Sequence, residues 1–462
     1  MTTTLWSGRF DGAPDAAAFD FGASFRFDRR LFEDDVNGSR AWARALGRAG
    51  VLPTEEAQRI DAALGAILER AAREPDFLSG HDEDVHSFVE RLLVESLGDS
   101  GRRLHTGRSR NEQVSVDLRL YLKRRIPLLQ RAAAGVVQAL ADQAEKAGDA
   151  LMPAYTHFRP AQPVLVAHFL LSHAAPLVRD VERFAGALRE ADALPLGSGA
   201  IAGTAYAIDV DALARDLGFT RVVDNSMDAS SDRDFAATFL YACALTMVHL
   251  SRMAEDVIIF GGDEHRFFEL SDALSTGSSM MPQKKNPDPM ELVRGKTGRS
   301  IGHLVGLLTT LKGLPTGYNK DLQEDKEAVF GAEDTLTGCL AVIRSVVDGL
   351  TLNRQRAADA ASGLLLATDV ADYLVGRGVP FRRAHEIVGG LVRKLVAEHR
   401  DFPSLSMEEW RAASDQFSAD IRERMTPAVS VSAKQTPQST APAAVGARLA
   451  GVRKWLAGQG LC

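Results

Sequence analysis

The feature that most constrains the fold is the regular spacing of apolar residues through 114–147. Leu118, Leu122, Ile126 and Leu129 recur at three- or four-residue steps, which is the period of one face of an α-helix. Three further segments have similarly broad apolar faces: 161–190, 233–260 and 289–312. Alternating strand patterns bounded by turn residues are few, and there is no internal repeat. The sequence therefore predicts an all-α fold, with Pro127 as a kink in the first long helix.

Local signals predict the ends of several elements. Thr54 precedes two acids and is predicted as a helix N-cap, and Ser406 with Glu409 fits a capping box. The Pro- and Ser-containing segment 426–445 is predicted as a surface loop. We expect boundaries near 112 and 362, which divide the chain into an N-terminal domain at 1–112, a central long-helix bundle at 113–361 and a C-terminal domain at 362–462.

The helix expected at 289–312 contains Gly298, Gly302 and Gly306 on one stripe of one face. Each Gly destabilises a helix by about 1 kcal/mol relative to Ala. We therefore expect another backbone to approach this stripe closely, either within a packed bundle or at a subunit interface. A locally loose helix is the alternative.

Charge and cysteine content exclude several classes of protein. The net charge is −7, with 54 Lys and Arg against 61 Asp and Glu, so binding to nucleic acid or to an anionic membrane is not expected. The three cysteines lie far apart, at Cys243, Cys339 and Cys462, and no His cluster has metal-ligand spacing. We expect no disulfide and no metal site, which fits a reducing, cytoplasmic location.

Two further observations argue against a membrane or secretory segment. The first ten residues lack the charged and apolar regions of a signal peptide. The most apolar stretch, 235–250, is shorter than the roughly 20 residues that cross a bilayer. It is predicted as a buried helix.

Residues 276–291, TGSSMMPQKKNPDPME, concentrate reactive groups in one short polar loop. The loop offers hydroxyls, cations, an amide and a carboxylate, from Ser278, Ser279, Lys284, Lys285, Asn286 and Glu291. Such a set suits removal of a proton from carbon beside a carboxylate, because the carbanion survives only where cations and donors stabilise it. A mobile surface turn is the alternative interpretation.

The loop sequence GSSMMPQKKNP resembles the signature GSSxMPxKxNP of the fumarase/aspartase superfamily at every fixed position. LHTGRSRNEQ at 104–113 and MPAYTHFRPAQP at 152–163 resemble two other active-site segments of that superfamily. Within it, the chain is most similar to the argininosuccinate lyase family, on the segments DEDVHSFVE at 82–90, YNKDLQEDKE at 318–327 and LATDVADYLVGRGVPFRRAHE at 366–386. The resemblance covers nearly the whole chain.

This resemblance implies a three-domain helical subunit. Its long central helices would form a twenty-helix core in a homotetramer, with each active site assembled from three subunits. It also implies reversible cleavage of argininosuccinate to arginine and fumarate by anti β-elimination, as a step of arginine biosynthesis, with no metal or organic cofactor.

The resemblance also implies catalytic roles. Ser278 matches the family's catalytic serine, and His157 matches the histidine that assists departure of the guanidino nitrogen. We take Ser278 as the base and His157 as the acid; the reverse assignment is the alternative. Glu291 matches a residue that contacts this histidine, and Lys284 and Asn286 match groups that hold the succinyl carboxylate.

Substrate-binding positions of the family match residues in several segments: Ser24, His86, Ser109, Arg110, Asn111, Thr156, Asn286, Tyr318, Gln323 and Lys326. A structural histidine at His86 and an ordinary surface cation at Arg110 are the alternatives there. Lys285 is expected to be a solvated neighbour of the loop. Glu112 departs from the family, which more often has Asp at this position.

Two other functions remain open at this point. A related lyase could act on adenylosuccinate or carry out fumarase-like chemistry, and a helical assembly of this family could lack activity altogether. The segment YNKDLQEDK argues against the first, and the intact Ser278, Lys284 and His157 argue against the second.

Overall fold

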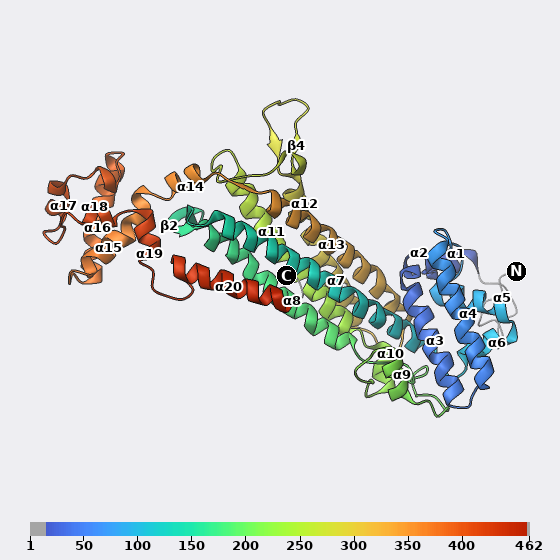
Figure 1. Cartoon of the computed structure of the whole chain (residues 1–462). Helices are drawn as coiled ribbons and strands as arrows, with labels where there is room; N and C mark the ends of the chain where they lie inside the picture. Colours follow the sequence, from blue (N-terminus) through green and yellow to red (C-terminus); the bar gives the residue numbers. More distant parts are fainter. Residues whose placement is uncertain (1–14, 460–462) are drawn as a thin grey trace. The chain divides into compact units, whose positions relative to one another are not determined.

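The computed structural model describes residues 15–459 (Figure 1). The predictions about the first ten residues and about Cys462 lie outside this range. The described chain divides into two compact units. Unit 1 comprises the residues up to Gln130, Glu182–Ala244 and Gly298–Leu336; unit 2 comprises Arg131–Val181, Leu245–Thr297 and the residues from Thr337 on.

Within residues 15–459, five long helices form the framework of both units, and the sequence predicted all of them except the helix at 325–349. They are α7 (Arg110–Ala147), α8 (Val166–Ala191), α11 (Asp234–Gly261), α12 (Asp288–Leu311) and α13 (Asp325–Gly349), and each contributes residues to both units. Pro127 lies inside α7. Three of the four predicted segments agree with the observed helices to within a few residues, and the all-α class is confirmed.

Shorter helices complete each unit. In unit 1 they are α1 (Ala16–Gly22), α2 (Phe25–Asp28), α3 (Phe32–Arg48), α4 (Thr54–Arg73), α5 (Val85–Leu97), α6 (Asp99–Arg102), α9 (Val210–Asp216) and α10 (Ser226–Ser231). In unit 2 they are α14 (Arg354–Ala360), α15 (Ala367–Val375), α16 (Phe381–Ala397), α17 (Met407–Ala413), α18 (Ile421–Arg424), α19 (Pro427–Ser432) and α20 (Pro442–Gly458). Helices α3 and α4 lie side by side (Figure 1).

Strands between residues 15 and 459 form only antiparallel pairs, all in unit 2. They are β1 (Leu151–Thr156) with β2 (Arg159–Leu165), β3 (Phe268–Glu269) with β6 (Thr351–Leu352), and β4 (Thr276–Gly277) with β5 (Lys285–Asn286). The predicted helix start at 161 is therefore wrong, since β2 continues to Leu165. Pro160 and Pro163 lack the N–H that a helix interior needs, and a two-stranded pair tolerates them.

Two predictions about helix ends are wrong and one is confirmed. Helix α4 begins at Thr54 itself, and its N-cap is Pro53, whose fixed φ suits that position. The segment 426–445 is not a continuous loop, because Thr426 caps α19 by accepting from the N–H of Val429. The Ser406–Glu409 capping box is present.

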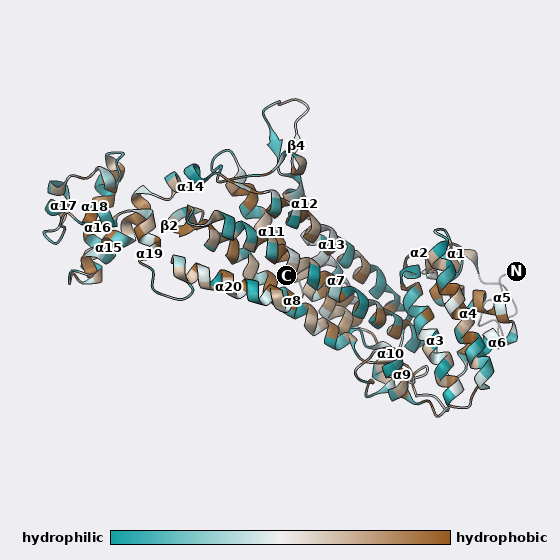
Figure 2. Cartoon of the chain, in the orientation of Figure 1, coloured by the Kyte–Doolittle hydropathy of each residue, from teal (hydrophilic) through white to brown (hydrophobic). Residues whose placement is uncertain are grey.

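Helix α11 is the only helix within residues 15–459 that is long and apolar enough to cross a membrane, by length and composition. Phe235, Phe239, Leu240, Met247 and Leu250 are buried on it. It is hydrophobic around much of its circumference (Figure 2), which is typical of a core helix. The prediction of a buried helix at 235–250 is confirmed.

The glycine stripe of α12 faces open space within the described chain. No heavy atom there lies within 4 Å of the position that a Cβ would take at Gly298, Gly302 or Gly306. Ile301 and Val305, on the same side of the helix, are 42% and 56% exposed. Close packing within this chain is therefore wrong as a prediction, and a subunit interface stays a prediction.

Candidate active site

The site residues predicted from the sequence fall into two groups, one in each unit. Unit 1 contains Ser24, His86, Ser109, Arg110, Asn111, Tyr318, Gln323 and Lys326. Unit 2 contains Thr156, His157, Ser278, Lys284, Asn286 and Glu291.

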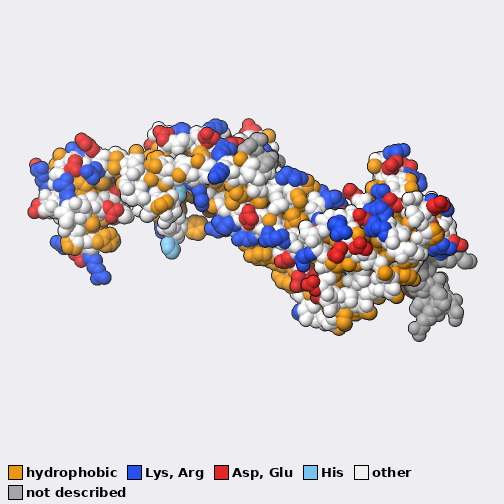
Figure 3. Space-filling view, turned by 60° about the horizontal axis from the view of Figure 1, so that its bottom comes forward, with side chains coloured by type: hydrophobic (Ala, Val, Ile, Leu, Met, Phe, Trp, Pro, Cys, Tyr) orange, Lys and Arg blue, Asp and Glu red, His pale blue; other side chains and the backbone are white. Residues whose placement is uncertain are grey.

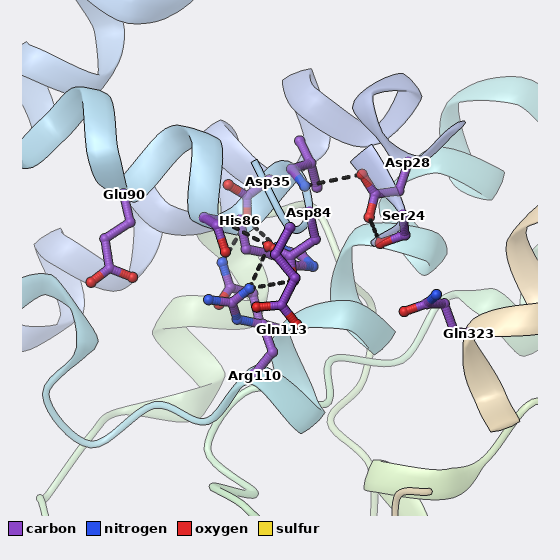
Figure 4. Close-up of polar contacts among 12 residues, drawn as sticks. Ser24, Asp28, Asp35, Asp84, His86, Glu90, Arg110, Gln113 and Gln323 are labelled. Carbon is purple, nitrogen blue, oxygen red and sulfur yellow. Dashed lines mark hydrogen bonds and ion pairs between the residues drawn. The ribbon is translucent and has the colours of Figure 1, made fainter. Parts of the chain in front are cut away.

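A buried polar cluster in unit 1 consists of Ser24, Asp28, Asp84, His86 and Arg110 (Figure 4). Ser24 Oγ donates to Asp28 Oδ2 at 2.5 Å, and Asp28 Oδ1 accepts from the N–H of Val85 at 3.0 Å. Arg110 Nη1 contacts both oxygens of Asp84, at 2.6 and 2.5 Å. Asp84 also caps α5 by accepting from the N–H of Ser87 at 2.7 Å.

Electrostatics fixes the charges in this cluster. Burial raises the pKa of Asp84, but the Arg110 guanidinium and His86 outweigh it and hold that pKa well below its usual range. Burial lowers the pKa of Arg110, and Asp84 more than reverses this effect. The Asp84–Arg110 pair is therefore ionised. Arg110 is not an ordinary surface cation, since its side chain is only 27% exposed and is held by a carboxylate.

Asp28 and Asp84 were not predicted from the sequence as members of the cluster. Asp84 carried a usable signal, because an Asp directly before apolar residues at helical spacing, here Val85, Phe88 and Val89, is a typical N-cap. Asp28 carried none, since its partner Val85 is distant in the sequence.

His86 belongs to a second, deeper set of contacts. Its Nδ1 lies 2.8 Å from Asp35 Oδ1 and 3.3 Å from Asp117 Oδ2, with all three side chains buried. One potential ligand atom from each residue lies within 4.8 Å of the others, so they meet a geometric criterion for a cation site. The 2.8 Å distance from Nδ1 to Asp35 is that of a hydrogen bond, and half-buried Arg108 already supplies positive charge to both carboxyl groups. The group is therefore a set of polar contacts centred on His86.

The segment 109–111 is fastened to a glycine-rich loop by Glu112. The Glu112 carboxylate accepts from three backbone N–H groups: Ser109 at 3.0 Å, Gly197 at 2.7 Å and Gly199 at 3.0 Å. Asn111 Nδ2 donates to the carbonyl of Ala200 in the same loop, at 3.1 Å. Glu112, where the family more often has Asp, thus ties two loops together.

The residues expected to recognise the arginine end of the substrate are only partly available. Lys326 is buried and pairs with Asp325 at 2.8 Å, and Asp325 also accepts from Arg233 Nε at 2.5 Å. Gln323 Nε2 donates to the carbonyl of Gly22 at 3.2 Å. Tyr318 is half-buried, and burial raises its pKa to about 12, so its hydroxyl stays protonated.

In unit 2, the signature loop is a hairpin closed by β4 and β5. Ser278 follows β4, and its Oγ accepts from the N–H groups of Met280 at 3.3 Å and Met281 at 3.0 Å. Asn286 Nδ2 donates across the hairpin to Thr276 Oγ1 at 3.4 Å. The serine oxygen thus lies in a small nest of backbone donors.

The two adjacent lysines of this hairpin, Lys284 and Lys285, differ in the contacts that their ammonium groups make. Lys285 is exposed, as predicted, but it is not free in solvent: its Nζ pairs with Asp272 at 2.8 Å and donates to the carbonyl of Leu270 at 2.5 Å. Lys285 lies within β5, and its side chain ties the hairpin to 270–272. Lys284 precedes the strand, is exposed, and has no hydrogen bond or ion pair from its ammonium to any described residue.

His157 lies at the tip of the hairpin formed by β1 and β2. His157 and Phe158 form its two-residue turn, with φ of 53° and 56°, in the left-handed region that non-glycine residues rarely adopt. Both side chains are exposed, Phe158 to 83%. Among the described residues, no hydrogen bond or ion pair joins the side chains of His157 and Glu291.

On the face drawn in Figure 3, positively and negatively charged side chains are intermingled, with apolar side chains between them. This agrees with a modest net charge of −7. Attraction of an anion therefore depends on individual cations such as Arg110 and Lys284.

The chain resembles known proteins over most of its length. It matches the family described as Lyase over residues 8–302 and the family described as Argininosuccinate lyase C-terminal over residues 364–432. An argininosuccinate lyase of Moorella thermoacetica is 48% identical over 456 residues, covering 98% of each chain. An argininosuccinate lyase of Heliobacterium mobile is 45% identical over 460 residues, covering 99% of this chain and all of the relative.

Solved structures have the same fold. A variant of EDDS lyase with bound fumarate matches with a TM-score of 0.83 at 26% identity, covering 97% of this chain and 93% of the other. A fumarate lyase from Mesorhizobium sp. BNC1 matches with a TM-score of 0.76 at 20% identity, covering 93% and 99%. At that lower identity, the likeness concerns the fold alone.

Proposed function

The chain belongs to the argininosuccinate lyase family of the fumarase/aspartase superfamily, and on this premise we propose that it cleaves argininosuccinate reversibly to L-arginine and fumarate. The reaction is an anti β-elimination: a proton leaves the Cβ of the succinyl part while the bond from Cα to the guanidino nitrogen breaks. The electron pair of the C–H bond becomes the double bond of fumarate, and the departing nitrogen takes up a proton.

Ser278 is the proposed base, and its surroundings are the observation that carries the proposal. A serine hydroxyl is a poor base unless its alkoxide is stabilised. The two N–H groups that point at Ser278 Oγ, from Met280 and Met281, supply part of that stabilisation without any rearrangement. The unpaired ammonium of Lys284, on the same hairpin, supplies a positive charge for the alkoxide or for the substrate carboxylate.

Lys284 and Asn286 are proposed to stabilise the intermediate. Removal of the Cβ proton places a second negative charge on the adjacent carboxylate, and each donor aimed there lowers the barrier by about 3 kcal/mol. Lys284 suits this role because its charge is not used by a neighbouring acid. Lys285 does not, since Asp272 already holds it.

His157 is the proposed acid, assisted by Glu291 and adjacent to Thr156. Imidazole exchanges protons near neutral pH, which suits protonation of the departing nitrogen. The left-handed backbone at His157 and Phe158 costs of order 1–3 kcal/mol per residue, and such strain is typical of functional positions. The tip is also exposed, so its side chains are available to a site completed by another chain.

The buried polar cluster and the neighbouring 109–111 segment are proposed to bind the substrate. Ser109, Arg110 and Asn111 would hold a carboxylate. Tyr318, Gln323 and Lys326, with Ser24 and His86, would line the site for the arginine end. Ser24, Arg110, Asn111, Gln323 and Lys326 are already held by the contacts described above, which reduces the entropy lost on binding.

We propose a homotetramer in which three subunits contribute to each active site. The open glycine stripe of α12 supports this assembly, because a face with Gly298, Gly302 and Gly306 lets a second helix approach closely. The exposed Ile301 and Val305 on that face would be buried by the same contact. The three-domain division at 112 and 362, a role in arginine biosynthesis and a cytoplasmic location are proposed with it.

A substrate panel tests the activity. Purified protein is given argininosuccinate, adenylosuccinate or malate in turn, and fumarate release is followed by the ultraviolet absorbance of its conjugated double bond. Turnover of argininosuccinate alone is expected. Turnover of adenylosuccinate or malate instead would assign a related lyase, and no turnover of any would favour a structural assembly.

A further inference from the structure

Three buried groups from three different helices meet beside the proposed binding site. Asp35 comes from α3, His86 from α5 and Asp117 from α7, and their side chains are 1%, 2% and 1% exposed. His86 is a proposed substrate-binding residue, whereas the two acids have no role in the proposed function. Two acids so deeply buried need a reason, since burying a carboxylate is costly unless it is paired.

Donors converge on Asp35 but not on Asp117. Asp35 Oδ1 lies 2.8 Å from His86 Nδ1 and accepts from Gln113 Nε2 at 2.5 Å. Both oxygens of Asp117, and Oδ2 of Asp35, are buried without a hydrogen-bond partner among the described residues. An oxygen of each carboxyl group lies within 4.8 Å of the other. At this separation the two groups repel each other if both are ionised, and a single shared proton removes the repulsion and supplies a hydrogen-bond donor.

The charges around the group also favour one proton. Half-buried Arg108 acts on both acids and contributes one positive charge, which one ionised carboxylate balances. The other titratable groups that act on the three residues are Asp28, Asp34, Asp84, Glu90, Arg110 and His105. Most of these are acids, so a second ionised carboxylate here would add to an excess of negative charge.

The directions of the pKa shifts agree with this distribution. Burial, then the charges of Asp35 and Asp34, raise the pKa of Asp117 well above its usual value. Burial also acts to raise the pKa of Asp35, but His86 and Arg108 outweigh it, and the pKa is lowered. Asp117 therefore holds the proton, and Asp35 is the carboxylate.

We propose that Asp117 is a neutral carboxylic acid that donates its proton to Asp35, and that Asp35 holds the Nδ1–H tautomer of His86 so that Nε2 faces the substrate. Asp35 and Asp117 are thus positioning residues that act through His86. Nε2 forms no hydrogen bond with any residue in 15–459, so it is available to accept one from a ligand. This inference rests on the proposed function only for the identity of that ligand.

Two matched substitutions, Asp117→Asn and Asp35→Asn, test the proposal in the assembled full-length enzyme. Asn keeps a donor where a protonated Asp has one, so Asp117→Asn is expected to raise KM for argininosuccinate at least threefold less than Asp35→Asn does. Asp35→Asn removes the acceptor that selects the tautomer, and is expected to raise KM about tenfold or more and to alter the pH profile of kcat/KM. A purely structural role would leave that profile unchanged.

Thermal unfolding against pH gives a second readout that needs no activity. Because the folded pKa of Asp117 is raised, its contribution to stability is complete below the unfolded value and is lost as pH rises through the folded value. Asp117→Asn cannot ionise, so its Tm is expected to gain on the parent as pH rises.

Three results of these experiments would overturn the proposal. Equal losses of activity in both variants, a Tm difference that does not change with pH, or failure of Asp117→Asn to fold would each overturn the proposal. If the parent does not cleave argininosuccinate, the proposed function fails, while the Tm comparison still decides whether Asp117 is neutral.

Discussion

The two regions that hold the candidate site residues are built in opposite ways. In the buried polar cluster of unit 1, every charged side chain has a partner, as Arg110 has Asp84. On the two hairpins of unit 2, His157 and Lys284 are exposed and their side chains bind nothing in the described chain. The proposed binding groups are therefore held in place by the fold, whereas the proposed acid His157 and the proposed stabilising cation Lys284 lie on short turns without a side-chain partner in residues 15–459.

This difference follows from the chemistry asked of each region. A carboxylate or guanidinium that recognises a ligand gains from being held rigidly, because less entropy is then lost on binding. A base or acid that changes protonation during turnover is weakened by a permanent ionic partner, which favours one of its two states. Substitutions in the hairpins should therefore affect turnover with little change in stability, and substitutions in the cluster should affect binding or stability.

The largest effect is expected for Ser278→Ala. Loss of the proposed base should lower kcat by about 10²–10⁴-fold, the usual contribution of general acid–base catalysis. Tm should stay the same, because Ser278 Oγ only accepts from two N–H groups of its own exposed loop. Ser279→Ala is the matched control and should keep activity within tenfold. A Ser278→Ala variant with a Tm clearly below that of the parent would contradict the distinction between the two regions.

The neighbouring lysines give the next largest contrast. Lys284→Ala should lower kcat by about 10²–10³-fold at unchanged Tm, since an unpaired donor aimed at developing charge is removed. Lys285→Ala should instead loosen the base of the hairpin, because the contacts to Asp272 and Leu270 are lost. Its kcat should fall much less. Similar losses in both variants, measured by fumarate release, would contradict the separate roles.

In unit 1, Glu112→Asp should weaken the binding of the substrate. Shortening the side chain by one methylene prevents the carboxylate from reaching Ser109, Gly197 and Gly199 together. We expect KM for argininosuccinate to rise about tenfold with a smaller change in kcat, as charge-assisted hydrogen bonds that hold the loop are lost. Glu90→Asp, the same change at a half-buried acid without backbone donors, is the control. An unchanged KM would show that the glycine-rich loop follows the shorter side chain.

The smallest effect is a pH dependence of stability from His105. Burial, with Arg108 and Arg110, lowers the pKa of His105 to about 3, so the folded protein keeps it neutral. As pH falls from about 6.5 toward 3, the unfolded chain takes up this proton and the folded one does not, so stability is lost. His105→Gln should flatten the fall of Tm in that range by a few °C. His81→Gln, at an exposed histidine, should not.

The hairpin of unit 2 was predictable from the sequence because its residues are contiguous. GSSMMPQKKNP contains the hydroxyl, the cation and the amide within one short segment, and local chain geometry brings them together. The different roles of Lys284 and Lys285 were not predictable, because they depend on where β5 begins and on the distant Asp272. The β1–β2 pair was also missed, since its prolines obscure the alternation that marks a strand.

In unit 1, the long helices followed from apolar periodicity, but the network between them did not. Asp84 with Arg110, and Glu112 with Gly197, join residues that are far apart in sequence, and propensity carries no information about such pairs. Asp35 and Asp117 lie on helix faces that look amphipathic in isolation. Only the packing of α3, α5 and α7 makes them buried neighbours of His86.

The left-handed turn at His157 and Phe158 has a consequence for attempts to make this protein more heat-resistant. Asn and Gly adopt such a backbone at little cost, so an Asn-Gly tip would relieve the strain and raise Tm. A library selected only for stability at high temperature should therefore enrich substitutions at these two positions. The most thermostable variants should be the ones that have lost catalytic activity.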